Sequence, residues 1–112
     1  MSTAPAHVAW DAVAVVTVAP GIERQVVHGD GFTALRLRLA AGAVLPRHTH
    51  VHEQGTTLFS GRLAVDAAGA TIELGPGESL VIPGELAHEA RALTDVLALE
   101  IFVPAREDLP AS

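Results

Sequence analysis

Short apolar segments with a period of two run through almost the whole sequence, and glycine or proline ends nearly every one of them. The clearest lies at residues 32–39, where three leucines, Leu35, Leu37 and Leu39, alternate with Arg36 and Arg38. This alternation predicts a strand with one buried face, because successive side chains of a strand point to opposite sides. No segment shows a sustained helical period. Short strands spaced by roughly eight to twelve residues predict an all-β sandwich or barrel.

The same criteria predict the other strands of this fold. Their ranges are 13–18, 44–50, 58–59, 63–65, 71–74, 80–82 and 96–103, with turns at Gly21, Gly61, Gly69 and Gly75-Pro76-Gly77. At 112 residues the chain has room for one hydrophobic core, so we expect a single domain.

The composition excludes several classes of function. Thirteen acidic residues against seven basic ones, all arginine, give a net charge of -6. This charge disfavours nucleic acids and anionic membrane surfaces as partners. The absence of lysine excludes Schiff-base chemistry, and the absence of cysteine excludes disulfides and thiolate ligands. The N-terminal residues carry no positive targeting segment, and the apolar stretch 12–19 is too short to cross a bilayer, so we expect a cytoplasmic protein.

Histidines supply the candidate chemistry. His48 and His50 are two residues apart, so on a strand both imidazoles can point at one divalent ion. Gln54 is four residues after His50, so on a strand it would point to the same side and could add a carbonyl oxygen. His88 follows a proline and could close the site from a neighbouring strand. A histidine in a β protein is more often exposed or hydrogen-bonded, so the spacing alone leaves a structural role about as plausible as a metal site.

Two stretches resemble the paired motifs of the cupin superfamily in every gap. The motif positions are Gly42, His48, His50, Gln54 and Gly61 in the first stretch and Gly77, Pro83 and His88 in the second. The sequence departs from the second motif where Gly84 follows the proline directly and where Ala92 replaces a frequent asparagine. The resemblance implies a cupin jelly-roll barrel, or double-stranded β-helix, over residues 1–112 with its core at about 32–104. It also implies one divalent transition metal on His48, His50, Gln54 and His88.

Gln54 stands where most cupins have glutamate. A neutral fourth ligand leaves the full charge on the metal, which makes the ion a stronger Lewis acid and weakens its binding. For a reaction without redox change, zinc or nickel is favoured, with iron or manganese as alternatives.

The C-terminal stretch 100–108 narrows the resemblance to the small monocupins of pectin degradation, which open the ring of unsaturated uronates. Its Glu100, Phe102 and Arg106 match the acid, aromatic and arginine of that group, although the acid there is usually aspartate. The resemblance implies that Glu100 and Arg106 are catalytic and that Phe102 shapes the substrate pocket. For His52 a substrate contact at the pocket mouth is one reading, and an exposed or supporting role is the other. The alternatives to these two catalytic roles are that Glu100 faces solvent at the end of its strand and that Arg106 is a solvated arginine after it.

The resemblance therefore implies a metal-dependent isomerase or lyase-type enzyme acting on a 4,5-unsaturated uronate or a related anionic sugar acid. Three alternatives stay open: an iron-dependent dioxygenase, a polyketide cyclase-type monocupin and a non-enzymatic ligand-binding cupin. Small cupins commonly dimerise, and the apolar strand at residues 12–18 is a candidate edge for a homodimer.

Overall fold

The computed structural model describes residues 3–109, which form ten strands and one short 3-10 turn, η1 (Trp10–Ala12). The strands are β1 (Val16–Ala19), β2 (Ile22–His28), β3 (Thr33–Leu39), β4 (Val44–His48), β5 (Glu53–Ser60), β6 (Leu63–Ala67), β7 (Ala70–Leu74), β8 (Ser79–Ile82), β9 (His88–Ala92) and β10 (Val96–Val103). No helix in this part of the chain is long and apolar enough to cross a membrane. The prediction of an all-β fold is confirmed.

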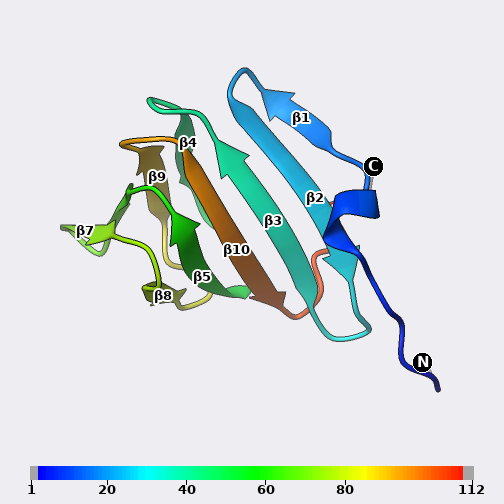
Figure 1. The fold of residues 1–112 in the computed structure, drawn as a ribbon. Coiled ribbons are helices and arrows are strands. Elements are labelled where there is room, and N and C mark those ends of the chain that lie inside the picture. The colour runs from blue at the N-terminus through cyan, green and yellow to red at the C-terminus, as the bar shows by residue number, and fades with distance from the viewer. Residues whose placement is uncertain (1–2, 110–112) are drawn as a thin grey trace.

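The strands form two antiparallel sheets that face each other as a jelly roll (Figure 1). The six-stranded sheet has the order β1-β2-β3-β10-β5-β8, and the four-stranded sheet has the order β4-β9-β6-β7. Sheet order differs from chain order, so β10 lies between β3 and β5 and brings the C-terminal stretch to the centre of the larger sheet.

The hydrophobic core fills the space between the sheets. Leu35, Leu37 and Leu39 are all buried, whereas Arg38 on the opposite face of β3 is exposed. The same alternation runs along β10, where every second residue from Val96 to Phe102 is buried. Burying each leucine contributes about 1.5–3 kcal/mol, which explains why the period of two persists through these strands.

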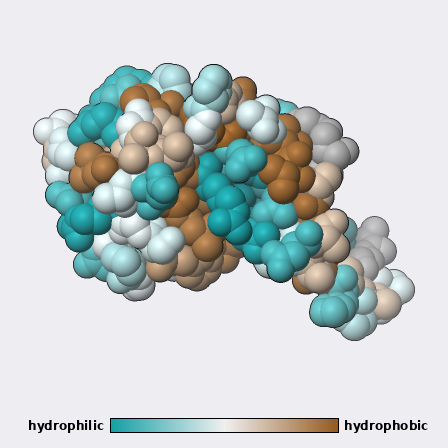
Figure 2. All heavy atoms as spheres, turned by 45° about the horizontal axis from the view of Figure 1, so that its top comes forward, coloured by the Kyte–Doolittle hydropathy of each residue, from teal (hydrophilic) through white to brown (hydrophobic). Residues whose placement is uncertain are grey.

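Large hydrophobic residues are exposed on several elements, among them Val18 on β1, Ile72 on β7 and Val81 on β8. Figure 2 shows hydrophilic and hydrophobic residues interleaved on the face it presents, with the N-terminal segment projecting from the body of the molecule. Single exposed apolar side chains of this kind are ordinary for a protein surface.

Several predicted boundaries were wrong. Residues 22–28 and 88–92 form β2 and β9, which we did not predict; β2 contains three consecutive polar residues, Glu23 to Gln25, that hide its alternation. β5 begins at Glu53 rather than residue 58, and β4 ends at His48 rather than His50. β1 begins at Val16 rather than residue 13. The segment before it is bonded to a side chain instead of a neighbouring strand, because Gln25 Nε2 donates to the carbonyl oxygens of Trp10 and Val13.

Candidate metal centre and pocket

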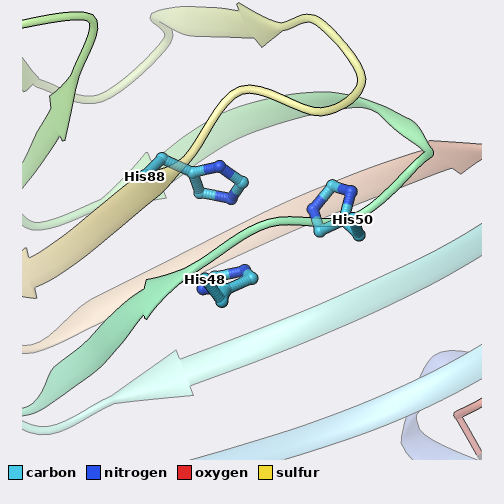
Figure 3. A group of neighbouring side chains, drawn as sticks. All are labelled: His48, His50 and His88. Carbon is cyan, nitrogen blue, oxygen red and sulfur yellow. The ribbon is translucent and has the colours of Figure 1, made fainter.

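Three imidazoles meet between the two sheets. One nitrogen each from His48, His50 and His88 lies within 4.8 Å of the others. Figure 3 shows His48 and His50 on one segment and His88 on the neighbouring one, with the rings gathered around a common space. The sequence prediction that these three histidines lie together is confirmed.

The fold brings them together by a route that differs from the predicted one. His48 and His88 are directly opposed cross-strand partners at the adjoining ends of β4 and β9. His50 lies beyond the end of β4, so strand parity does not place it. The loop before β9 holds it instead, because the Glu85 N–H donates to the His50 carbonyl oxygen at 2.8 Å. Gly84 permits this approach, since a Cβ there would collide with the carbonyl oxygen of Val51.

Hydrogen bonds to the backbone determine which nitrogen of each ring is available. In all three rings Nδ1 contacts a carbonyl oxygen, which can only accept, so Nδ1 carries the proton and Nε2 keeps its lone pair. The contacts are His48 to Pro46 at 2.8 Å, His50 to His52 at 3.0 Å and His88 to Leu86 at 2.8 Å.

Gln54 approaches from β5 in the other sheet. Its amide Nε2 donates to Thr56 Oγ1 at 3.0 Å and to Glu100 Oε2 at 2.7 Å. Its carbonyl oxygen Oε1 therefore faces His50 Nε2, at 3.0 Å. With the His50 proton on Nδ1, two lone-pair atoms face each other, and such a pair is stable when a cation lies beside both.

The residues present fit a divalent metal ion. His88 Nε2 is buried and has no hydrogen-bond partner, so its lone pair is left for a ligand. Burial lowers the pKa of both His50 and His88, assisted by the charge of Arg106, and this keeps the two imidazoles neutral and able to coordinate. Three imidazole nitrogens and an amide oxygen suit zinc, nickel, iron or manganese.

Glu100 lies inside the barrel, which removes the alternative that it faces solvent. Glu100 is 8% exposed, and its Oε2 accepts hydrogen bonds from Gln54 Nε2 and from Thr56 Oγ1, the latter at 2.9 Å. Burial raises the pKa of the Glu100 carboxyl, although these two hydrogen bonds and the charges of His48 and Arg106 favour its ionised form.

A cavity of about 200 Å³ extends from this centre between the sheets. His48, Gln54, His88, Glu100, Phe102 and Arg106 line one part of it, and mostly aliphatic side chains, together with Arg24 and Thr56, line the rest. The Arg106 guanidinium lies 4.8 Å from the centroid of the Phe102 ring and binds the Asp108 carboxylate, with its closest contact at 2.7 Å. The side chain is 15% exposed, so the alternative of a freely solvated arginine is wrong.

His52 does not line this cavity. Its Nδ1 is buried without a hydrogen-bond partner, and its ring centroid lies 5.5 Å from that of His50. A direct contact between His52 and a ligand remains a prediction.

Two residues of the cavity were missed by sequence reasoning. Thr56 could have been found, because it is two residues from Gln54 and so shares its face on a strand. Arg24 lies on β2, the strand that was not predicted, and its Nε is buried without a partner. The buried Ile22 and Val26, two residues to either side, carry the signal that Arg24 points inward.

The family-model comparison matches residues 35–103 to the cupin domain. The chain belongs to the cupin family. Among solved structures, KdgF from Halomonas sp. is 33% identical, with 85% of this chain and 89% of that chain covered and a TM-score of 0.80. An RmlC-like cupin from Shewanella frigidimarina is 25% identical, with 96% and 98% covered and a TM-score of 0.87.

A salicylate 1,2-dioxygenase variant from Pseudoaminobacter salicylatoxidans is 25% identical over 78% of this chain and 27% of its own, with a TM-score of 0.73. No curated protein sequence matches the chain. The cupin resemblance seen in the sequence, including its resemblance to small monocupins of the KdgF kind, is thereby confirmed.

Proposed function

We propose that this cupin is a metal-dependent enzyme that opens or isomerises the ring of a 4,5-unsaturated uronate or a related anionic sugar acid. The observation that carries the proposal is the convergence of three chemical groups in one cavity. These are the imidazole cluster with Gln54, the buried carboxylate of Glu100 and the guanidinium of Arg106. Resemblance to the pectin-degradation cupins supplies the substrate class.

His48, His50, Gln54 and His88 would hold the metal ion. When bound, the ion supplies positive charge that polarises an oxygen of the substrate. All four ligands are neutral, so the protein leaves that charge undiminished. Ring opening involves no net oxidation, which favours zinc or nickel and permits iron or manganese.

Arg106 binds the substrate carboxylate. Its guanidinium already holds a carboxylate, that of Asp108, through both Nε and a terminal nitrogen, at 3.3 and 2.7 Å. A substrate carboxylate would replace Asp108 in the same two-point geometry. Phe102, stacked against the guanidinium, keeps this group against the cavity wall.

Glu100 moves the proton. Both of its hydrogen bonds end on Oε2, so Oε1 has no hydrogen-bond partner among residues 3–109. In the opening of the cyclic hemiacetal at C1, Oε1 would take the proton of the C1 hydroxyl as the C1 carbonyl forms and the bond from C1 to the ring oxygen breaks. The ring oxygen leaves as the enolate of the C4–C5 double bond, and delivery of the same proton to C4 gives the C5 ketone, removes the double bond and returns Glu100 to its starting form.

The test follows the ultraviolet absorbance of the conjugated double bond of an unsaturated uronate. Zinc- or nickel-loaded protein should accelerate its loss over buffer with the same metal. Arg106→Met should raise KM, whereas Arg38→Met, on the exposed outer face of β3, should not. A rate equal to that of buffer and metal would refute the proposal.

An oxygen-activating cupin is the second candidate. The similarity to salicylate 1,2-dioxygenase and a ligand cluster that also suits iron favour it. Oxygen uptake by iron-loaded protein with an aromatic hydroxy acid, and no action on uronates, would decide for it. Metal binding without either activity would favour a non-enzymatic binding module, and turnover of a polyketide chain would favour a cyclase.

The protein is also proposed to form a homodimer through β1. This strand is the outer edge of the six-stranded sheet; Val18 within it is 50% exposed, and Val15 just before it is 56% exposed. Pairing of two edges would satisfy the free backbone groups of both copies. Sedimentation of a dimer that Val18→Lys dissociates would support this, and a monomer at all concentrations would refute it.

A further inference from the structure

Glu100 and Gln54 form a buried pair on neighbouring strands of the larger sheet. The β5–β10 register places Gln54 opposite Phe102 and Thr56 opposite Glu100, so the two side chains are diagonal neighbours on the inner face. Gln54 is 5% exposed and Glu100 is 8% exposed. Their contact, from Gln54 Nε2 to Glu100 Oε2 at 2.7 Å, is the shorter of the two hydrogen bonds made by the amide nitrogen.

We infer that Glu100 is a positioning residue that orients the Gln54 amide toward the metal centre, and that its buried carboxylate requires a neutral hydrogen-bond donor at position 54. The inference rests on the proposed metal site. It adds a second role for Glu100, carried by Oε2, to the role proposed for Oε1.

The orientation of an amide is decided by its neighbours, because a half-turn exchanges its oxygen and its NH2 group without changing its shape. Thr56 cannot decide it, since a hydroxyl both donates and accepts. Glu100 Oε2 also accepts a hydrogen bond from Thr56 Oγ1, so it is an acceptor at this position and must face the NH2 group. After a half-turn, the Gln54 oxygen would face the carboxylate and the NH2 group would face the metal centre, and both contacts would be unfavourable.

The same geometry explains why position 54 is glutamine rather than glutamate. In a glutamate at this position, the oxygen that replaces Nε2 would lie about as close to Glu100 Oε2 as the present 2.7 Å contact. Two buried carboxylates at that distance cannot both be ionised, so one would have to hold a proton. Glutamine at position 54 avoids a second carboxylate at this distance and supplies the N–H group that Glu100 Oε2 accepts.

The test compares four variants by two measurements that do not require activity. The variants are Glu100→Gln, Glu100→Leu, Gln54→Glu and the exchange Gln54→Glu/Glu100→Gln. The measurements are zinc affinity, by competition with a chelator, and urea unfolding of the metal-free protein. Thr56→Val is the matched control, because it removes a hydrogen bond from the same network and leaves the carboxylate in place.

Glu100→Leu should weaken zinc binding 10- to 100-fold, the range typical of residues that orient a metal ligand. Glu100→Gln retains an acceptor for the amide and should stay within about threefold of the parent protein, as should Thr56→Val. Gln54→Glu should lower the unfolding free energy of the metal-free protein, and the exchange should restore it, because donor and acceptor are paired again.

Unchanged zinc affinity in Glu100→Leu would overturn the positioning role, and additive effects of the two single changes would overturn the coupling. These results are separate from the uronate assay: loss of zinc affinity without any uronate activity would support the inference and refute the proposed reaction. A parent protein that binds no zinc would refute the metal site, and the unfolding measurements would still test the pairing.

Discussion

Gly61, between β5 and β6, should be the most sensitive glycine of the barrel to substitution by alanine. Its φ of 89° is unfavourable for any residue with a Cβ, and an added Cβ would lie 2.9 Å from Thr94 Oγ1 and overlap the carbonyl oxygen of Asp95. The conformation alone costs about 1–2 kcal/mol. The overlap must also separate two segments that are joined by hydrogen bonds from the Arg62 N–H to Thr94 Oγ1 and from the Leu93 N–H to the Arg62 carbonyl oxygen.

Losing these two hydrogen bonds costs about 1 kcal/mol each, so Gly61→Ala should lower the unfolding free energy by about 3–4 kcal/mol. Gly69→Ala is the matched control: φ is 76°, and nothing lies within 4 Å of the added Cβ. It should cost only the conformational part, about 1–2 kcal/mol. Urea unfolding with a common m-value measures both. Equal losses in the two variants would refute the steric part of this argument.

Three further predictions test separate parts of the structure. His88→Ala should abolish stoichiometric metal binding measured by elemental analysis, whereas His7→Ala, at an exposed N-terminal position, should not; equal metal content in both would contradict the ligand assignment. Arg24→Met should leave the unfolding free energy unchanged or raise it by about 1 kcal/mol, because it removes a buried nitrogen without a partner, and a marked loss of stability would show that Arg24 has a structural partner. The pKa of the Asp66 carboxyl is lowered by hydrogen bonds from Thr71 and Arg91, so its ionised form stabilises the fold above its ordinary pKa, and this contribution is lost as pH falls through the lowered value. The stability difference between the parent and Asp66→Asn should therefore shrink below about pH 4, and a difference that grows on acidification would contradict this.

The sequence predicted those parts of the fold that depend on local period. The alternation in β3 is strong because its inner face carries leucines and its outer face arginines, whereas β10 is a continuous apolar run interrupted only by Glu100. Both strands were found at or within one residue of their bounds. β2 was not predicted because both of its faces carry polar residues, which hides the period of two. Gln25, on the face opposite to the core, is buried beneath the N-terminal segment.

Motif spacing determined which residues could gather at the site: His48, His50, Gln54 and His88 were named from the sequence, and the structure brings them together. Only the tertiary structure decided how they do so. His50 is placed by a loop before β9 rather than by strand parity, and Gln54 comes from the opposite sheet.

The state of Glu100 was also decided by tertiary structure alone. Its hydrogen bond to Gln54 joins residues 46 positions apart, through the pairing of β10 with β5. Local sequence determines the period and identity of side chains, since these depend on neighbours in the chain. Which carboxylate meets which amide depends on the order and register of strands that are distant in sequence, and that is settled only when the sheets assemble.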